Sequence, residues 1–124
     1  MASIEVVHGD ELEPAEATPG ITRELAIDAD GVQMVRSQGE PGIESGWHHH
    51  GDHDIYGYQL AGRVVLEFGP AGNETVQAGP GDFFHIPAGT VHRDVNPDDD
   101  VHQEVLLTLI GEGPLVVNVD GPGE

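Results

Sequence analysis

The sequence contains no cysteine, no lysine and no long hydrophobic run, and each absence excludes a class of protein. Without cysteine there are no disulfide bonds, no thiol catalysis and no thiolate metal ligands. No apolar stretch approaches the roughly 20 residues that cross a bilayer, so we expect no membrane-spanning helix. The N-terminal residues have neither the basic region nor the apolar core of an export signal, so we expect a cytoplasmic protein.

Basic residues are almost missing, since four arginines stand against 23 acidic residues and give a formal net charge of −19. A chain with so few cations cannot neutralise a polyanion, so we expect it to bind neither nucleic acid nor anionic membranes. Self-repulsion of this size weakens a small fold at low ionic strength. The composition resembles that of proteins from halophilic archaea. A nucleic-acid mimic is the alternative, which the dispersed positions of the acids disfavour.

Glycine and proline are abundant, at 18 and 9 of 124 residues, and they divide the chain into short apolar segments. A chain of this length forms one domain. Many short segments separated by turns predict an all-β sandwich or barrel. The expected strands cover residues 4–7, 32–36, 47–50, 55–60, 63–68, 74–77, 83–86, 91–95, 103–110 and 114–119.

The two ends of the chain give weaker signals. Segment 11–17 has a helix-like composition, but Pro14 lies inside it and limits the expectation to one short turn. We expect residues 8–20 to be loose, the core of the domain to cover about residues 30–119, and the glycine- and proline-rich tail 121–124 to be frayed.

Histidine is in excess, and six of the eight histidines fall in two short segments. These are His48, His49, His50 and His53, followed by His85 and His92. Neutral imidazole is the most common metal ligand in proteins. On a strand, His48 and His50 point to the same face, and His92 at the end of a later strand could close a metal site with them. An acid near His50, such as Asp54, could complete it.

Two segments of the chain match a pair of motifs with fixed spacing. The first motif, G-x5-H-x-H-x3/4-E-x6-G, corresponds in order to Gly42, His48, His50, Asp54 and Gly62. The second motif, G-x5-P-x-G-x2-H-x3-N, is matched at every position by Gly81, Pro87, Gly89, His92 and Asn96. The chain therefore resembles a single-domain cupin. The resemblance implies an antiparallel jelly-roll barrel that holds one divalent transition metal through His48, His50, His92 and Asp54.

The first motif departs from the family pattern in two ways. The acid is an aspartate, and seven residues instead of six separate it from Gly62, which would place Ile55 in the acid position. Because a shift of one residue reverses the face of a strand, two arrangements stay open. A bulge, for instance at Gly57, would return Asp54 to the interior, and we favour this arrangement. Otherwise Ile55 takes the position, and the site resembles the three-histidine iron site of thiol dioxygenases.

A site of imidazole and carboxylate without sulfur suits iron, manganese, zinc, nickel, cobalt or copper. The neighbouring Asp52 and His53 are alternative ligands. The resemblance implies a metal-dependent enzyme acting on a small polar or aromatic metabolite, first a dioxygenase and next an isomerase or lyase. We expect Tyr56 or Tyr58 to contact the substrate or to transfer a proton.

Two functions of other classes stay open. One is a non-catalytic cupin that binds a small ligand through its metal, as a sensor or storage protein. The other is a barrel that a structural metal stabilises. The family resemblance also implies a homodimer, because a small barrel has strand edges that need to be covered. Segments 4–7 and 114–119 are the expected interface strands.

Overall fold

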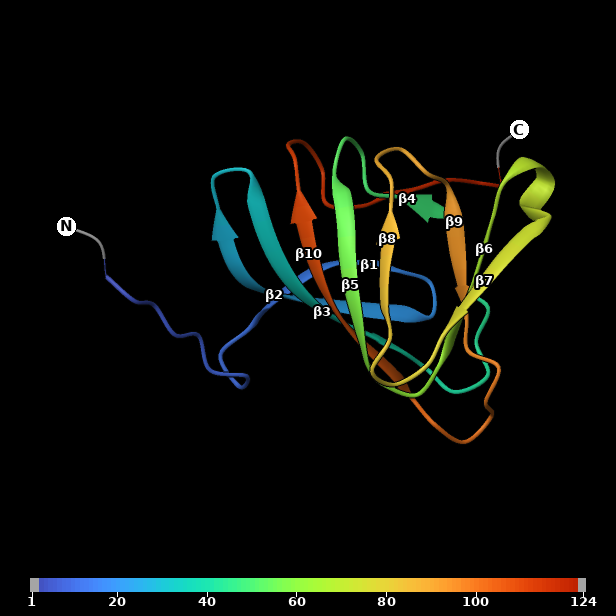
Figure 1. Cartoon of the computed structure of the whole chain (residues 1–124), viewed down its shortest axis with the longest axis horizontal. Coiled ribbons are helices and arrows are strands. Elements are labelled where there is room, and N and C mark those ends of the chain that lie inside the picture. The colour runs from blue at the N-terminus through green and yellow to red at the C-terminus, as the bar shows by residue number, and fades with distance from the viewer. Residues whose placement is uncertain (1–2, 123–124) are drawn as a thin grey trace.

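The computed structural model describes residues 3–122, which form two antiparallel sheets packed face to face (Figure 1). The larger sheet contains β1 (Glu13–Thr18), β2 (Ile21–Ala29), β3 (Val32–Gly39), β10 (Gln103–Ile110), β5 (Asp54–Ala61) and β8 (Phe83–Ile86), in that order. The smaller sheet contains β11 (Val117–Asn118), β4 (His48–His49), β9 (His92–Val95), β6 (Val64–Phe68) and β7 (Glu74–Ala78). The only helical turn in this part of the chain is η1 (Pro70–Gly72). The all-β jelly-roll prediction is confirmed.

The core lies between the two sheets because their strands alternate buried and exposed residues. In β10, Val105, Leu107 and Leu109 are buried, whereas the residues between them are more exposed. Val64 and Leu66 of β6 meet them from the smaller sheet. Within residues 3–122, no helix is long and apolar enough to span a bilayer.

Strand β5 contains one irregularity, and it lies at Leu60 instead of Gly57. Gln59 and Ala61 pair with consecutive residues of β10, so Leu60 is an extra residue between them. This bulge absorbs the additional residue of the first motif near the end of the strand. The earlier part of β5 therefore keeps a regular register, with Ile55 completely buried.

Two strands near the N-terminus correct the sequence prediction. Residues 13–18 form β1 instead of a helical turn or a loose segment, and β2 follows over residues that we assigned to no strand. Pro14 is compatible with β1 because this strand lies at the edge of its sheet, where a missing N–H group is tolerated. The predicted strand at 4–7 does not form, and Ile4 is 97% exposed. Of the predicted tail, residues 123 and 124 lie outside the described part.

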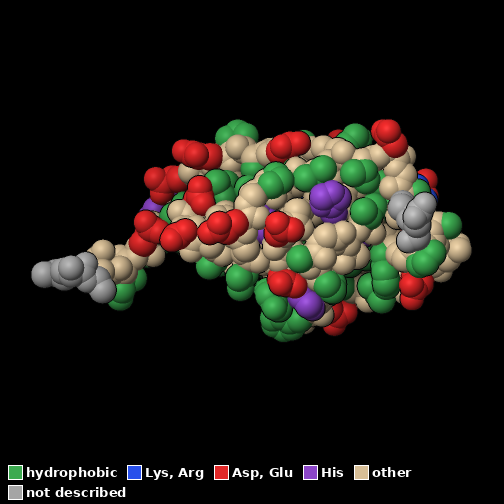
Figure 2. Space-filling model, turned by 90° about the horizontal axis from the view of Figure 1, so that it is seen from above, with side chains coloured by type: hydrophobic (Ala, Val, Ile, Leu, Met, Phe, Trp, Pro, Cys, Tyr) green, Lys and Arg blue, Asp and Glu red, His purple; other side chains and the backbone are tan. Residues whose placement is uncertain are grey.

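The acidic side chains are spread over the surface. On the face that Figure 2 shows, acidic side chains lie among apolar and polar ones over most of the view, with several in a row on the side from which the N-terminal segment extends. This distribution agrees with the dispersed positions of the acids in the sequence.

Candidate metal centre

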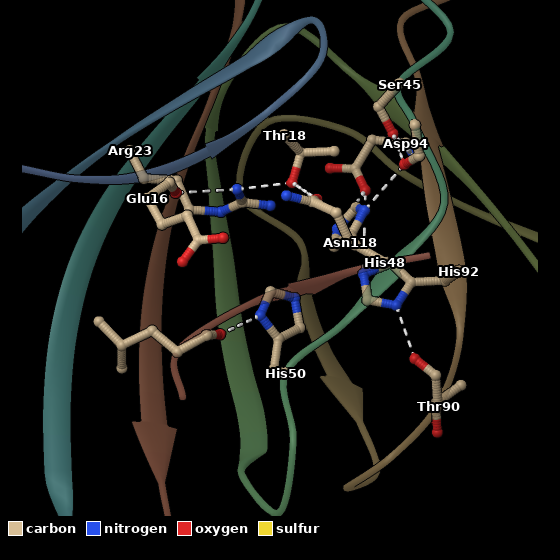
Figure 3. Close-up of polar contacts among 12 residues, drawn as sticks. Glu16, Thr18, Arg23, Ser45, His48, His50, Thr90, His92, Asp94 and Asn118 are labelled. Carbon is tan, nitrogen blue, oxygen red and sulfur yellow. Dashed lines mark hydrogen bonds and ion pairs between the residues drawn. The ribbon is translucent and has the colours of Figure 1, made fainter. Parts of the chain in front are cut away.

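Three histidines meet inside the barrel, where β4 and β9 lie side by side (Figure 3). His48 of β4 and His92 of β9 are direct partners across the two strands. His50 follows two residues after His48 and points to the same face. The candidate ligand nitrogens of the three rings all lie within 4.8 Å of one another. The structure thus brings together the three histidines that the sequence analysis grouped.

A backbone carbonyl fixes the orientation of each ring. His48 Nδ1 donates to the carbonyl of Gly46 at 2.9 Å, and His50 Nδ1 donates to the carbonyl of Leu115 at 2.8 Å. His92 Nδ1 donates to the carbonyl of Thr90 at 2.9 Å. Because a carbonyl only accepts, the proton of each neutral ring resides on Nδ1. The Nε2 lone pair of each ring is therefore free to bind a metal.

Burial keeps these rings neutral. Desolvation, followed by the neighbouring histidines, lowers the pKa of His48 to about 2. The same causes lower the pKa of His50 to about 3, and burial also lowers the pKa of His92. Metal binding requires the unprotonated ring, so no proton competes for these nitrogens near neutral pH.

The structure does not bring Asp54, Tyr56 or Tyr58 to the histidines. The regular register of β5 turns all three to the outer face of the larger sheet. There, Asp54 Oδ1 lies 3.0 Å from His85 Nε2. The ring of Tyr56 stacks on His85 at a centroid distance of 4.8 Å. The bulge expected at Gly57, which would have returned Asp54 to the interior, is absent from β5.

The alternative ligands also lie elsewhere. His53 is buried, and its Nδ1 donates to the backbone carbonyl of His50 at 2.8 Å, but the ring is not part of the group whose ligand nitrogens converge. Asp52 is exposed in the turn before β5. His49 faces away from the three rings, and its Nδ1 accepts a hydrogen bond from the backbone N–H of Gly51.

Two charged residues that the sequence analysis missed, the buried Arg23 and the half-buried Asp94, lie beside the histidines (Figure 3). Asp94 Oδ1 lies 3.7 Å from His48 Nε2 and 3.9 Å from His92 Nε2. Arg23 of β2 is 6% exposed, and its Nη1 donates to Thr18 Oγ1 at 2.8 Å. The signal for Asp94 was its position two residues after His92, which places both on the same face of a strand.

Two adjoining cavities surround this cluster. The inner one, of about 20 Å³, is lined by the three histidines together with Arg23 and Asp94. The outer one, of about 320 Å³, borders the same site through His92. Its apolar lining comes from strands of both sheets and the turn after β8: Leu66, Phe68, Val76, Phe84, Ile86 and Pro87. A molecule in this apolar pocket would therefore lie next to His92.

The same fold occurs in several solved structures. The polyketide cyclase RemF from Streptomyces resistomycificus is 24% identical, with a TM-score of 0.74 over 94% of this chain and 86% of that chain. KdgF from Halomonas sp. is 25% identical, with a TM-score of 0.69 over 88% and 96% of the two chains. An oxalate oxidase is 21% identical, with a TM-score of 0.67 over 81% and 55%.

The sequence itself identifies the family. No match was found among curated proteins. Residues 36–109, more than half of the 124, match the sequence model of the family described as Cupin domain. This range includes both motifs and all three histidines of the cluster, and the chain therefore belongs to the cupin family.

Proposed function

We propose that this cupin is a metal-dependent enzyme, of the dioxygenase type, that acts on a small and largely apolar or aromatic metabolite. One observation carries the proposal: three buried imidazoles present free Nε2 atoms to a cavity that adjoins an apolar pocket. Clustered ligands beside a pocket of this size are typical of a catalytic centre.

The residues present fit a divalent transition metal. Three neutral imidazole nitrogens, with the half-buried carboxylate of Asp94 close by, suit any of the ions from manganese to zinc. His48, His50 and His92 would hold the ion. When bound, it would supply Lewis acidity and, if it is redox-active, activation of O₂.

The chain's own residues prepare this centre. The carbonyls of Gly46, Leu115 and Thr90 hold the three rings in fixed orientations before any ion binds. Such preorganisation reduces the reorganisation that binding and reaction require. Phe84 and Ile86 line both cavities and add apolar surface beside the ligand nitrogens. A dry, apolar site suits O₂ chemistry because reactive species are protected from water.

The lining of the outer pocket indicates the substrate. Six of its nine residues are apolar, and the remaining three are His85, Thr90 and His92. A compound with an aromatic or aliphatic body and one or two oxygen atoms directed to His92 would match this distribution. A sugar acid with many hydroxyl groups would leave several of them without hydrogen-bond partners.

A second candidate function is a structural metal that stabilises the barrel. The small inner cavity favours it, because about 20 Å³ is only enough for an ion or one water molecule. In that case the ion would have no coordination position open to the outer pocket.

Elemental analysis tests the metal site first. We expect untagged protein to contain about one equivalent of a single transition metal. The His92→Ala variant should lose it, whereas the control His85→Ala should retain it because His85 is exposed and outside the cluster. The proposal fails if the wild type holds no more metal than His92→Ala, even after reconstitution with Fe(II), Mn(II), Ni(II) and Zn(II).

Oxygen uptake then separates the functions. With iron or manganese bound, we expect O₂ consumption on aromatic substrates and little on sugar acids. A zinc or nickel protein that turns over substrates without O₂ would instead be an isomerase or lyase. A bound paramagnetic ion whose signal does not respond to small ligands such as azide would indicate the structural role.

A further inference from the structure

The cluster contains a carboxylate oxygen without a partner. Asp94 Oδ1 is buried and has no hydrogen-bond donor among residues 3–122. Native proteins rarely leave a buried carboxylate oxygen unsatisfied, and such a group calls for an ion or a water molecule that binds it.

The histidine nitrogens beside this oxygen are acceptors as well. Its closest histidine nitrogens are Nε2 of His48 and of His92, at 3.7 and 3.9 Å. Both rings carry their proton on Nδ1, where it is donated to a carbonyl, so neither Nε2 can donate to Asp94. Lone pairs of two nitrogens and one oxygen thus converge beside a cavity that has room for an ion or one water molecule. A water molecule has two hydrogens and can donate to only two of these three acceptors, whereas a cation would attract all three.

We propose that Asp94 supplies the carboxylate ligand that the first motif assigns to Asp54, so that the ion is held by His48, His50, His92 and Asp94. The inference rests on the proposed function. Asp54 cannot serve because the register of β5 turns it outward to His85. Asp94 follows His92 by two residues on β9 and shares its face.

The backbone around Asp94 holds the carboxylate in place. The N–H of Asp94 donates to Ser45 Oγ at 2.9 Å, and the N–H of Ser45 donates to the Asp94 carbonyl at 2.8 Å. These bonds position the residue without using Oδ1, which stays available for an ion. Burial lowers the pKa of the Arg23 guanidinium, and its attraction to the carboxylates of Asp94 and Glu16 opposes part of that effect. Asp94 thereby offsets a positive charge that would otherwise oppose a cation beside it.

Metal affinity tests this assignment without an activity assay. Metal-free wild type, Asp94→Asn and the control Asp54→Asn would be titrated with Co(II) against a chromophoric chelator. We expect Asp94→Asn to weaken binding by more than about 100-fold, beyond the 10–100-fold typical of residues that only support a ligand. Its cobalt absorption bands should also shift. Asp54→Asn should match the wild type in affinity and spectrum.

Each outcome decides a separate question. Equal affinity and an identical cobalt spectrum in Asp94→Asn would overturn the inference, and so would loss of binding in Asp54→Asn alone. A wild type that binds no Co(II) would remove the proposed function and the inference together. If Asp94→Asn does not fold, as judged by circular dichroism, Asp94→Glu replaces it. A longer carboxylate ligand should change the cobalt spectrum, and an unchanged spectrum would contradict ligation.

Discussion

Each histidine of the cluster is held through one nitrogen and free at the other. The held nitrogen gives its proton to a backbone carbonyl, so the ring's orientation depends on the chain's path and not on a second side chain. His49, between two of these histidines in sequence, faces the other way and accepts a hydrogen bond from the N–H of Gly51. Strand alternation thus gives consecutive histidines different chemistry.

At the residue scale, the lowered pKa values predict acid sensitivity of the metal-free protein. An unfolded histidine has a pKa near 6.5, whereas His48 and His50 have values of about 2 and 3 in the fold. The unfolded state therefore binds more protons below pH 6.5, and stability falls as the pH decreases from there towards 3. Each group contributes about 1.4 kcal/mol per pH unit in this window. Urea denaturation of chelator-treated protein between pH 7 and 4.5 measures this decrease in the free energy of unfolding.

A variant isolates the contribution of His48 from that of the many carboxyl groups. Gln cannot titrate, so His48→Gln should show a flatter dependence of the unfolding free energy on pH than the wild type. The comparison uses slopes, which remain meaningful if the variant is less stable throughout. Parallel slopes for the two proteins would contradict a neutral, buried His48.

The sequence was sufficient to group the three histidines because the motif spacing and strand alternation point to the same face. It was insufficient for Tyr56 and Tyr58, whose direction depends on where β5 bulges. A bulge is a property of the pairing between β5 and β10, so neither strand reveals it alone. Asp94 could not be predicted from the motifs, because the family pattern places its acid in the first motif, whereas Asp94 follows the histidine of the second.

At the scale of elements, the packing of β8 against β5 depends on the absence of a side chain at Gly57. A methyl group at Gly57 would overlap the ring of Phe84 on the neighbouring strand. The ring lies over β5 and lines both cavities, so the missing side chain of Gly57 makes room for a wall of the site.

We therefore expect Gly57→Ala to lower the unfolding free energy by about 1–3 kcal/mol, the usual effect of overpacking a core. The Phe84 ring would be displaced. A matched control is Gly79→Ala, because the added methyl group would meet nothing closer than Asp82 Oδ2 at 3.8 Å. Urea denaturation of both variants is the measurement. Equal stabilities would show that Phe84 does not need the space above Gly57.

The strands from residue 32 onward were largely predicted, because turn residues separate them clearly. β1 and β2 were not, although Ile21, Arg23 and Leu25 of β2 stand at alternate positions, as on one face of a strand, before the register shifts at Ala26. The charge of Arg23 hid this pattern, since a buried arginine is rare without a site that needs it. The strand that sequence analysis missed therefore carries a residue of the candidate centre.

For the whole molecule, charge sets the response to salt. Arg36, Arg63 and Arg93 each lie within 4.0 Å of a carboxylate, yet four arginines can neutralise few of 23 acids. Screening of the remaining repulsion should raise the melting temperature by several degrees between 10 mM and 0.5 M KCl. Calorimetry in KCl and in K₂SO₄ at equal ionic strength separates screening from ion-specific effects. A melting temperature that falls with salt would show that the ion pairs outweigh the repulsion.

The homodimer is a prediction about the whole molecule, and a substitution in the N-terminal segment 4–7 tests it. This segment leads away from the barrel (Figure 1), with Ile4 97% and Val6 70% exposed. If it packs on a second copy, Ile4→Asp should convert a dimer of twice 13.1 kDa into a monomer. Val101→Asp places the same charge at another exposed apolar residue, 43% exposed, and should leave the dimer intact. Light scattering after size exclusion measures both, and a monomeric wild type in high salt would refute the prediction.

The bulge at Leu60 also bears on how cupin sequences are aligned. Insertions in this stretch can be taken up after the strand has passed the centre, so the closing glycine of the motif is a poor reference point. An alignment anchored on that glycine places Ile55, and not Asp54, in the acid position of the first motif. An alignment anchored on the histidine pair instead follows the part of the chain whose geometry is fixed. Family members with the same extra residue can then be recognised by an acidic residue two positions after the histidine of the second motif.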